Sequence, residues 1–304
     1  MKVFLTGGTG FVGGYVSRRL AESGCEVVVL SRSERSGSRL PTEVALEAGD
    51  STRPGAWQER IAECDAVINL AGASIFTRWT KEARKEIVES RILTTRHVVD
   101  ALRAGRQGKK TLLISASAVG FYGGRMDDAL LEEESPAGSD FLAGLSREWE
   151  AEARVAESAG ARVVICRFGI VFGRGGGALE KMIPAFRRGL GSPIGSGKQW
   201  FSWVHVEDLF RIMAFLMERE GLSGVVNCTA PNPVTNEELT RALAHTLKRP
   251  LIAPSIPGFV VRMVLGEFGD VLLTGQRVAP KRLLEEGFQF QFPELNGALE
   301  DLVH

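Results

Sequence analysis

The chain has 304 residues, 44% of them hydrophobic, and its 37 lysines and arginines balance its 37 aspartates and glutamates. A chain of this length can bury a full core as one large domain, or as one large and one small domain, and its even charge argues against nucleic acid or a membrane surface as a partner. The four scattered cysteines form no C-x-x-C pair, the four histidines show no metal-ligand spacing, and no apolar run is long enough to cross a bilayer. We therefore expect a cytoplasmic protein that contains no metal and acts on a small molecule.

The first fourteen residues predict a strand, a glycine-rich turn and the start of a helix. In the G-x-x-G-x-x-G pattern of Gly7 to Gly13, the first glycine permits a sharp turn, the second lets a ligand approach the backbone, and the third lets the helix lie close to the strand. Free N–H groups and partial positive charge at the helix start suit a pyrophosphate. The pattern predicts dinucleotide binding, with a merely structural turn as the alternative. The expected contacts here are Gly7, Thr9, Gly10, Phe11 and Val12.

The end of the second predicted strand, Glu26 to Leu30, indicates which dinucleotide is bound. Enzymes that use NAD usually carry an acidic residue at this point, which accepts from the ribose 2′-hydroxyl. Here Ser31 and Arg32 follow the strand instead. Because a guanidinium can pair with a 2′-phosphate and stack on adenine, this position predicts NADP rather than NAD. A solvated loop arginine is the alternative interpretation.

Two more predicted strands end in small or acidic residues. The third, Val44 to Asp50, ends in an aspartate that can cap the next turn or accept from the adenine amino group. The fourth, Asp65 to Gly72, is apolar as a buried parallel strand should be. It ends in Asn69-Leu70-Ala71-Gly72, where small residues would let the backbone pass close to the cofactor ribose, so Leu70, Ala71 and Gly72 are expected contacts.

A long helix over residues 80–106 follows, and on it Glu86, Ser90 and Arg91 lie about one turn apart. This spacing gathers a small polar cluster, which either contacts the cofactor or forms a surface salt bridge. The fifth strand, Lys110 to Ser115, ends at the carboxyl edge of the predicted sheet, where ligands of open α/β folds bind. Ser115 is therefore another expected cofactor contact.

The remaining chain predicts a helix over 141–159 preceded by Asp140 as a helix cap, a sixth strand over 162–166 and a glycine-rich exit from the sheet. Short helices broken by prolines occupy the C-terminal part. We therefore predict an α/β fold, a doubly wound parallel Rossmann sheet with a smaller, mainly helical C-terminal domain on the substrate side. The expected domains are 1–175, with a returning segment at about 198–230, and 176–304.

Six motifs occur in order along the chain: the glycine turn, Gly49-Asp50, Asn69-Leu-Ala-Gly72, the Ser115/Ser117 strand end, Arg167-x-Gly-x-Val-x-Gly173 and His205-Val-x-Asp-Leu209. Together they resemble the extended short-chain dehydrogenase/reductase superfamily of nucleotide-sugar epimerases and dehydratases. Further details, such as Trp149-Glu150 and Phe292-Pro-Glu-Leu295, resemble its "epimerase family protein" branch, which has atypical active sites. The resemblance implies NADP contacts at Ser31, Arg32, Leu70, Ala71, Glu86, Arg91 and Val171, and a possible homodimer.

The chain departs from that superfamily at the catalytic pair. Relatives use a Tyr-x-x-x-Lys pair in which the phenol is the acid/base, but here Ala143 and Arg147 occupy the matching positions. Arginine cannot act as a base, because its pKa stays above about 12. Ser117 matches the superfamily's catalytic serine, and Tyr122 is close enough in sequence to serve the same pocket, with packing as its alternative role.

Two functions follow from these features. The first is an NADP-dependent oxidoreductase or epimerase acting on a small carbonyl or sugar-like substrate, with Ser117 and Tyr122 as its catalytic residues. The second is a catalytically degenerate NADP-binding regulatory or sensor protein. For the first function, the candidate residues of an apolar substrate pocket are Phe76, Trp79, Trp200 and Trp203.

Overall fold

The computed structural model describes residues 1–33, 40–105 and 110–303. Its central element is a parallel sheet of seven strands in the order β11-β7-β5-β4-β1-β2-β3. The strands and the helices that flank them are β1 (Lys2–Thr6), α1 (Phe11–Glu22), β2 (Glu26–Ser31), β3 (Val44–Ala48), α3 (Trp57–Ile61), β4 (Ala66–Asn69), α4 (Lys81–Ala104), β5 (Leu112–Ala118), α5 (Phe141–Arg154), β7 (Arg162–Phe168), α7 (Val206–Glu218) and β11 (Gly224–Cys228).

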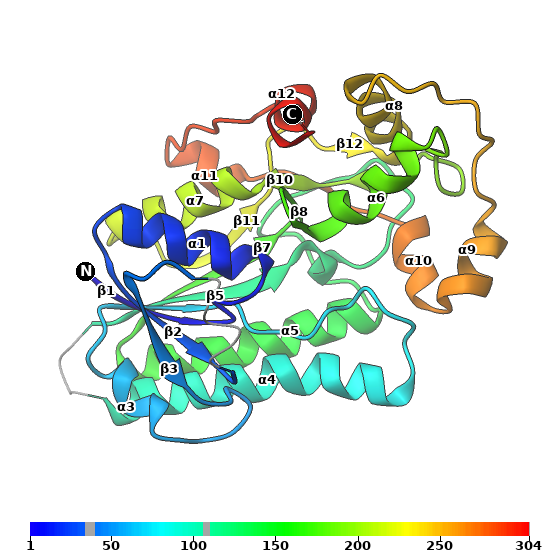
Figure 1. Cartoon of the computed structure of the whole chain (residues 1–304). Helices are drawn as coiled ribbons and strands as arrows, with labels where there is room; N and C mark the ends of the chain where they lie inside the picture. The colour runs from blue at the N-terminus through cyan, green and yellow to red at the C-terminus, as the bar shows by residue number, and fades with distance from the viewer. Residues whose placement is uncertain (34–39, 106–109, 304) are drawn as a thin grey trace.

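Helices cover both faces of the sheet, so its inner strands are apolar on both sides, whereas the edge strand β3 is largely exposed. On one face the buried core joins the strands to α1 and α7, and on the other it joins them to α3, α4 and α5. Figure 1 shows α1 and α7 above the sheet and α4 and α5 below it. The strand order reverses between β1 and β4, which is where ligands of doubly wound sheets bind. The predicted Rossmann sheet is confirmed.

Some helix ends differ from the sequence prediction. The helix expected over 141–159 is α-helical only to Arg154, and the next residues form a 3-10 turn, Val155–Ala159, that ends at Gly160 with φ of 79°. A glycine with positive φ stops an α-helix at this point because it adopts the left-handed conformation without a side-chain clash. Asp140 caps α5 as expected, since its side chain accepts from the Ala143 N–H at 2.9 Å.

A second lobe packs on the sheet's carboxyl edge. Its core joins α6 (Gly177–Arg187), α8 (Asn236–Thr246) and α12 (Leu295–Val303). The remaining elements of this region are β6 (Leu130–Leu131), β8 (Ile170–Gly173), β9 (Trp200–Phe201), β10 (Trp203–His205), β12 (Val234–Thr235), α9 (Gly258–Leu265), α10 (Phe268–Leu273), β13 (Arg277–Val278) and α11 (Lys281–Glu285). The chain returns to the sheet through α7 and β11, while the predicted boundary at residue 175 stays a prediction. Across the described ranges, no helix combines the length and apolarity that a membrane span requires.

Candidate functional site

The glycine-rich turn has the geometry expected of its first and third glycines. Gly7 has φ of 69°, and a Cβ there would lie 2.8 Å from the Ala71 nitrogen. A Cβ on Gly13 would lie 2.2 Å from the Gly7 carbonyl oxygen, so only glycine lets α1 pack this close to the turn. Gly10 is the N-cap of α1 and provides no side chain to the helix N–H groups. The helix start is therefore free to donate to an anion.

Phe11, the first residue of α1, fits into a slot made of glycines. A Cβ on Gly173 or Gly176 would lie 2.7 or 2.3 Å from atoms of the Phe11 side chain. The slot fastens the helix start to β8, the strand that contains the predicted contact Val171. The turn after β1 and the exit from β7 are therefore held together on one side of the candidate site.

A chain of buried hydrogen bonds fixes the loop after β4 beside this turn. The Thr6 hydroxyl donates to Asn69 Oδ1 at 2.6 Å, and Asn69 Nδ2 donates to Thr95 Oγ1 at 2.8 Å. Further along, the Ala73 N–H donates to Ser90 Oγ on α4 at 2.9 Å. The predicted contacts Leu70, Ala71 and Gly72 thus lie on a backbone that is held at both ends.

Arg91 lies half-buried next to this loop without a carboxylate. Its Nη1 donates to the Ile87 carbonyl at 2.9 Å, and its guanidinium lies 5.3 Å from the Trp149 ring centroid. A Cβ on Gly72 would lie 3.0 Å from the guanidinium carbon. Burial alone lowers the pKa of Arg91 to about 10. No ion pair neutralises this cation within the described part of the chain, so the site favours an anionic ligand.

The predicted adenosine end of the site holds Arg32 and Asp50. Arg32 is exposed after β2, and Ser31 Oγ donates to the Ser33 carbonyl at 2.9 Å. Asp50 accepts from the Thr52 N–H and hydroxyl at 3.0 and 2.8 Å, which is the capping role that the sequence left open. Burial opposes ionisation of Asp50, but the hydrogen bonds from Thr52 and the nearby Arg32 lower its pKa overall.

The other predicted cofactor contacts lie further apart. Glu86 is exposed on α4, one turn before Ser90 and Arg91. Ser115 is 1% exposed at the carboxyl end of β5, and its hydroxyl has no hydrogen-bond partner among the described residues. A buried hydroxyl of this kind is costly unless a ligand or water completes its hydrogen bonding.

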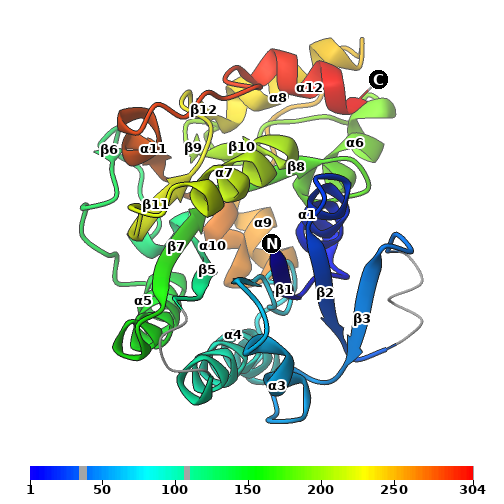
Figure 2. The same ribbon diagram turned by 90° about the vertical axis from the view of Figure 1, so that its left-hand side faces the viewer.

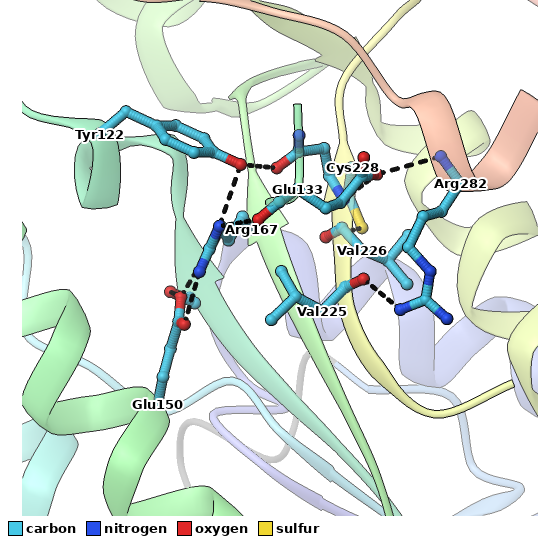
Figure 3. Close-up of polar contacts among 10 residues, drawn as sticks. Tyr122, Glu133, Glu150, Arg167, Val225, Val226, Cys228 and Arg282 are labelled. Carbon is cyan, nitrogen blue, oxygen red and sulfur yellow. Dashed lines mark hydrogen bonds and ion pairs between the residues drawn. The ribbon is translucent and has the colours of Figure 1, made fainter. Parts of the chain in front are cut away.

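Ser117 and Tyr122 belong to one buried polar network (Figure 3). The Ser117 hydroxyl donates to Glu150 Oε1 at 2.7 Å, and Arg167 forms two hydrogen bonds of 2.8 Å with the same carboxylate. Arg167 Nη1 also donates to the Tyr122 oxygen at 3.0 Å, and Tyr122 donates to Asn227 Oδ1 at 2.7 Å. The network joins β5, α5, β7 and β11 at the carboxyl edge of the sheet.

The network fixes where the hydroxyl protons point. Arginine only donates and a carboxylate only accepts, so the Ser117 proton is committed to Glu150 and Ser117 can offer only lone pairs to a ligand. The Tyr122 oxygen both accepts and donates within the network, and Tyr122 is 1% exposed. Burial raises the pKa of Tyr122, although Arg167 partly opposes this shift. The catalytic roles of Ser117 and Tyr122 stay predictions.

Sequence reasoning missed Glu150 and Arg167 as partners of these hydroxyls. The sequence did contain one indication of such a partner. Arg167 comes directly after the apolar run of β7, which suggests that its charge is buried, and a buried charge needs a partner. Glu150 lies on the face of α5 that packs on the sheet, together with Ala143 and Ser146. Nothing in the sequence, however, showed that these residues meet across two elements.

The aromatic residues expected to line a substrate pocket lie in three different surroundings. Trp203 is fully buried and stacks on Phe172, so it cannot line an open pocket. Phe76 and Trp79 lie in the loop after β4 and contact Phe268 of α10 at centroid distances of 5.5 and 5.8 Å. Trp200 donates to Asp128 and lies against Arg277, away from the first pair.

His205 is buried and caps a helix. Its Nδ1 accepts from the Glu207 N–H at 3.1 Å at the start of α7, and its Nε2 lies 3.3 Å from Asp301 Oδ2. Burial lowers the pKa of His205 in spite of the nearby carboxylates. Elsewhere in the described chain, no three His, Cys, Asp or Glu side chains gather as a metal site would need.

Comparison with known proteins places these features in one family. A model described as "NAD dependent epimerase/dehydratase family" matches residues 3–228, and one described as "Domain of unknown function (DUF1731)" matches residues 256–302. The "Epimerase family protein SDR39U1 homolog, chloroplastic" of Arabidopsis thaliana is 39% identical over 304 residues, covering 100% of this chain and 87% of that protein. The "Epimerase family protein YfhF" of Bacillus subtilis (strain 168) is 36% identical, with 100% and 98% covered.

A solved structure is also similar over nearly the whole chain. The crystal structure of human epimerase family protein SDR39U1 (isoform2) with NADPH is 35% identical, has a TM-score of 0.86 and covers 99% of both chains. The chain therefore belongs to the NAD dependent epimerase/dehydratase family.

Proposed function

We propose that this protein binds NADP(H) and acts as an oxidoreductase or epimerase on a small carbonyl or sugar-like molecule. The observation that carries the proposal is the half-buried guanidinium of Arg91. It lies next to the loop after β4, which borders the glycine-rich turn, and no carboxylate among the described residues pairs with it. Such a cation is stabilised by an anionic ligand. The human relative crystallised with NADPH supports the same choice of cofactor.

The residues present fit a dinucleotide phosphate. The uncapped start of α1 suits the pyrophosphate, and the exposed Arg32 suits a 2′-phosphate. Ser115 supplies a buried hydroxyl that lacks a partner. When bound, the nicotinamide group would supply hydride transfer. The contribution of this chain is to hold the phosphates, to orient the substrate and to keep water out.

Ser117 is the proposed orienting group for the substrate oxygen. Because its proton is donated to Glu150, Ser117 accepts a hydrogen bond, so it favours a substrate hydroxyl over a carbonyl. Tyr122 could exchange a proton with substrate only if its hydroxyl left Asn227 and Arg167. A water in the cleft is the other candidate for the proton donor.

Calorimetric titration with NADPH and NADH tests cofactor binding. NADP reduction with a panel of small alcohols, together with NADPH oxidation by the matching ketones and aldehydes, tests turnover. We expect NADPH to bind more tightly than NADH and at least one alcohol–carbonyl pair to be interconverted. Failure of the folded protein to bind either dinucleotide would overturn the proposal. A Ser117→Ala variant with unchanged turnover would remove Ser117 from the mechanism.

A second candidate function is an NADP-binding regulatory or sensor protein without turnover. The observation that favours it is the closed hydrogen bonding of Tyr122, together with the buried Ala143 at the position of the superfamily's phenol. Tight NADPH binding without reduction of any carbonyl, and a partner retained only with NADPH, would select this function. A homodimer and a cytoplasmic location also belong to the proposal, and light scattering of the purified protein tests the dimer.

A further inference from the structure

Helices α9 and α10 form a hairpin, residues 258–273, beside the carboxyl edge of the sheet. Figure 1 shows them in orange at the end of the molecule where α4 begins, and Figure 2 shows them behind the sheet, between the upper lobe and α4. The two helices pack on each other, with a Cβ on Gly269 lying 3.0 Å from the Val261 carbonyl oxygen and Arg262 paired with Asp270 at 2.7 Å. The hairpin is thus stabilised largely from within.

Both ends of the hairpin are fastened to the second lobe. Before α9, Ile256 exchanges backbone hydrogen bonds with the segment around Ile194, since the Gly195 N–H donates to the Ile256 carbonyl at 2.8 Å. In the last turn of α10, the Leu272 carbonyl accepts from Gln199 Nε2 at 2.9 Å. Arg125 and Gly275 then form a two-way backbone bridge at 3.0 Å. The two helices, residues 258–273, therefore span the distance between two anchored ends, and we call this segment the arch.

Between the anchors, a small contact surface joins the arch to the Rossmann part. Phe268 packs edge-on against Phe76 and tilted against Trp79. Glu267, next to it, pairs with Arg84 in the first turn of α4. Arg84 lies in turn over the Trp79 ring, with its guanidinium carbon 5.5 Å from the ring centroid. We call these residues the latch.

The latch lies next to the loop that borders the candidate site. Phe76 and Trp79 follow the loop of Ala71 and Gly72, which touches Gly7 and Arg91. Lys181 of α6 reaches within 5.8 Å of the Phe76 ring centroid. The arch, the loop after β4 and α6 therefore meet around the Phe76 ring.

The outer surface of the arch indicates low local stability. Phe259 is 70% exposed and Met263 is 68% exposed, so much of the apolar surface of α9 contributes nothing to packing. Val261 is the only buried side chain of α9. Segments with few buried apolar contacts open at a lower free energy than the core. From these contacts we infer that the hairpin is a lid, which opens as a unit at the latch and closes by seating Phe268 on Trp79.

Hydrogen exchange measured by mass spectrometry tests the lid in the purified full chain without ligand. We expect amides of residues 258–273 to exchange faster than those of β4 and β5. Phe268→Ala should raise hairpin exchange about tenfold, since truncating an aromatic contact shifts an equilibrium by roughly that factor. Glu267→Gln should raise it by less, because exposed ion pairs contribute little. Phe259→Ala, on the outer face of α9, is the matched control and should change nothing.

Trp79 provides a second readout in the same variants. Acrylamide quenching of tryptophan fluorescence should increase in Phe268→Ala, and the increase should vanish when Trp79→Phe is added. Far-ultraviolet dichroism of each variant shows that it is folded. The inference is overturned if hairpin amides exchange only together with the sheet, or if Phe259→Ala and Phe268→Ala behave alike. Neither measurement uses NADPH, so the result stands apart from the proposed function.

Discussion

Glu150 and Arg167 form an ion pair buried in the protein's interior, at 5% and 3% exposure. Each charge is tolerated because the other is present and because Ser117 and Tyr122 complete the hydrogen bonding. Removing one member leaves the other charge buried without compensation. The pair therefore contributes little net free energy of folding, but the loss of either member alone is strongly destabilising.

Helix α5 offers a matched test of this pair. Glu150→Ala should lower the free energy of unfolding by about 3–5 kcal/mol, because it strands the Arg167 charge. Glu152→Ala removes a similar two-bond contact with Arg96, but Arg96 is half exposed to solvent, and the loss should stay below about 1 kcal/mol. Urea denaturation of both variants measures the difference. Equal losses would contradict the role assigned to burial.

In the proposed site, Arg32 is the residue predicted to discriminate between the two dinucleotides. Arg32→Glu should reduce the preference for NADPH over NADH by about 10- to 100-fold, because a charge-assisted hydrogen bond is replaced by repulsion. Isothermal titration with each dinucleotide gives the ratio. Arg103→Glu, an exposed residue in the last turn of α4, makes the same change in net charge and should leave the ratio unchanged. An unaltered ratio in Arg32→Glu would refute the assignment.

His205 links stability to pH. Burial lowers the pKa of the folded state, while Glu207, Asp208 and Asp301 act in the opposite direction. As pH falls below about 6.5, the unfolded chain takes up a proton that the folded imidazole resists. The contribution of neutral His205 to the free energy of unfolding is therefore fully present above that pH, and it decreases as the pH falls towards the lowered pKa. His205→Gln should flatten the dependence of Tm on pH between about 5 and 7, while His245→Gln, at an exposed position, should not.

At the scale of elements, the strand, turn and helix formed by residues 2–22 illustrate how backbone packing limits the sequence. A Cβ at Gly13 would meet backbone atoms at 2.2 Å, whereas one at Gly14 would meet its nearest atom, the Gly8 carbonyl oxygen, at 3.7 Å. The two glycines are neighbours in α1, yet only the first lies against the turn. They form a matched pair for testing whether close packing shapes the ligand site.

Gly13→Ala should weaken both stability and NADPH binding, because α1 must move away from the turn. Gly14→Ala should change the free energy of unfolding by less than about 1 kcal/mol, since alanine is the better helix former and space is available. Urea denaturation and NADPH titration report the two effects separately. Similar behaviour of the two variants would show that the turn tolerates displacement of the helix.

Elements with strong local signals could be predicted from the sequence. The strands through Val27–Leu30 and Val163–Cys166 are apolar runs bounded by polar or glycine residues, and the structure confirms them. Asp140 was predicted as the cap of α5 from its position alone. The short pair of β8 and β10 could not be found, because two- to four-residue strands are defined by the partner they meet and not by their own pattern.

In the candidate site, too, the parts encoded by local sequence could be predicted and the long-range contacts could not. The glycine turn and the loop after β4 follow from local spacing, which a single stretch of chain carries. The commitment of Ser117 to Glu150, and of Tyr122 to Asn227, depends on contacts across 33 and 105 residues. No local pattern encodes such pairings, so the direction of the serine proton emerged only from the structure.

At the scale of the whole molecule, the C-terminal region completes the sheet. Strand β11 lies at its edge, where unpaired backbone groups invite aggregation. Glu133 accepts from the Asn227 N–H at 3.0 Å, and Arg282 donates to the carbonyls of Ser223 and Val225. Figure 3 shows Glu133 and Arg282 beside this strand, joined by a hydrogen bond from the Arg282 N–H to Glu133 Oε1 at 3.3 Å. The edge is thus covered by two segments that are 149 residues apart.

Because Arg282 follows β11 in the chain, the open edge of β11 can be covered only late in the synthesis of the protein. A nascent chain that has left the ribosome through residue 228 already contains all seven strands, but it lacks the arginine that shields the last of them. The exposed parallel edge must wait for more than fifty further residues, about three to ten seconds of translation at 5–20 residues per second. Chaperones that hold unpaired strands have their opportunity in that interval, and messages truncated within it should yield aggregates rather than a smaller working protein.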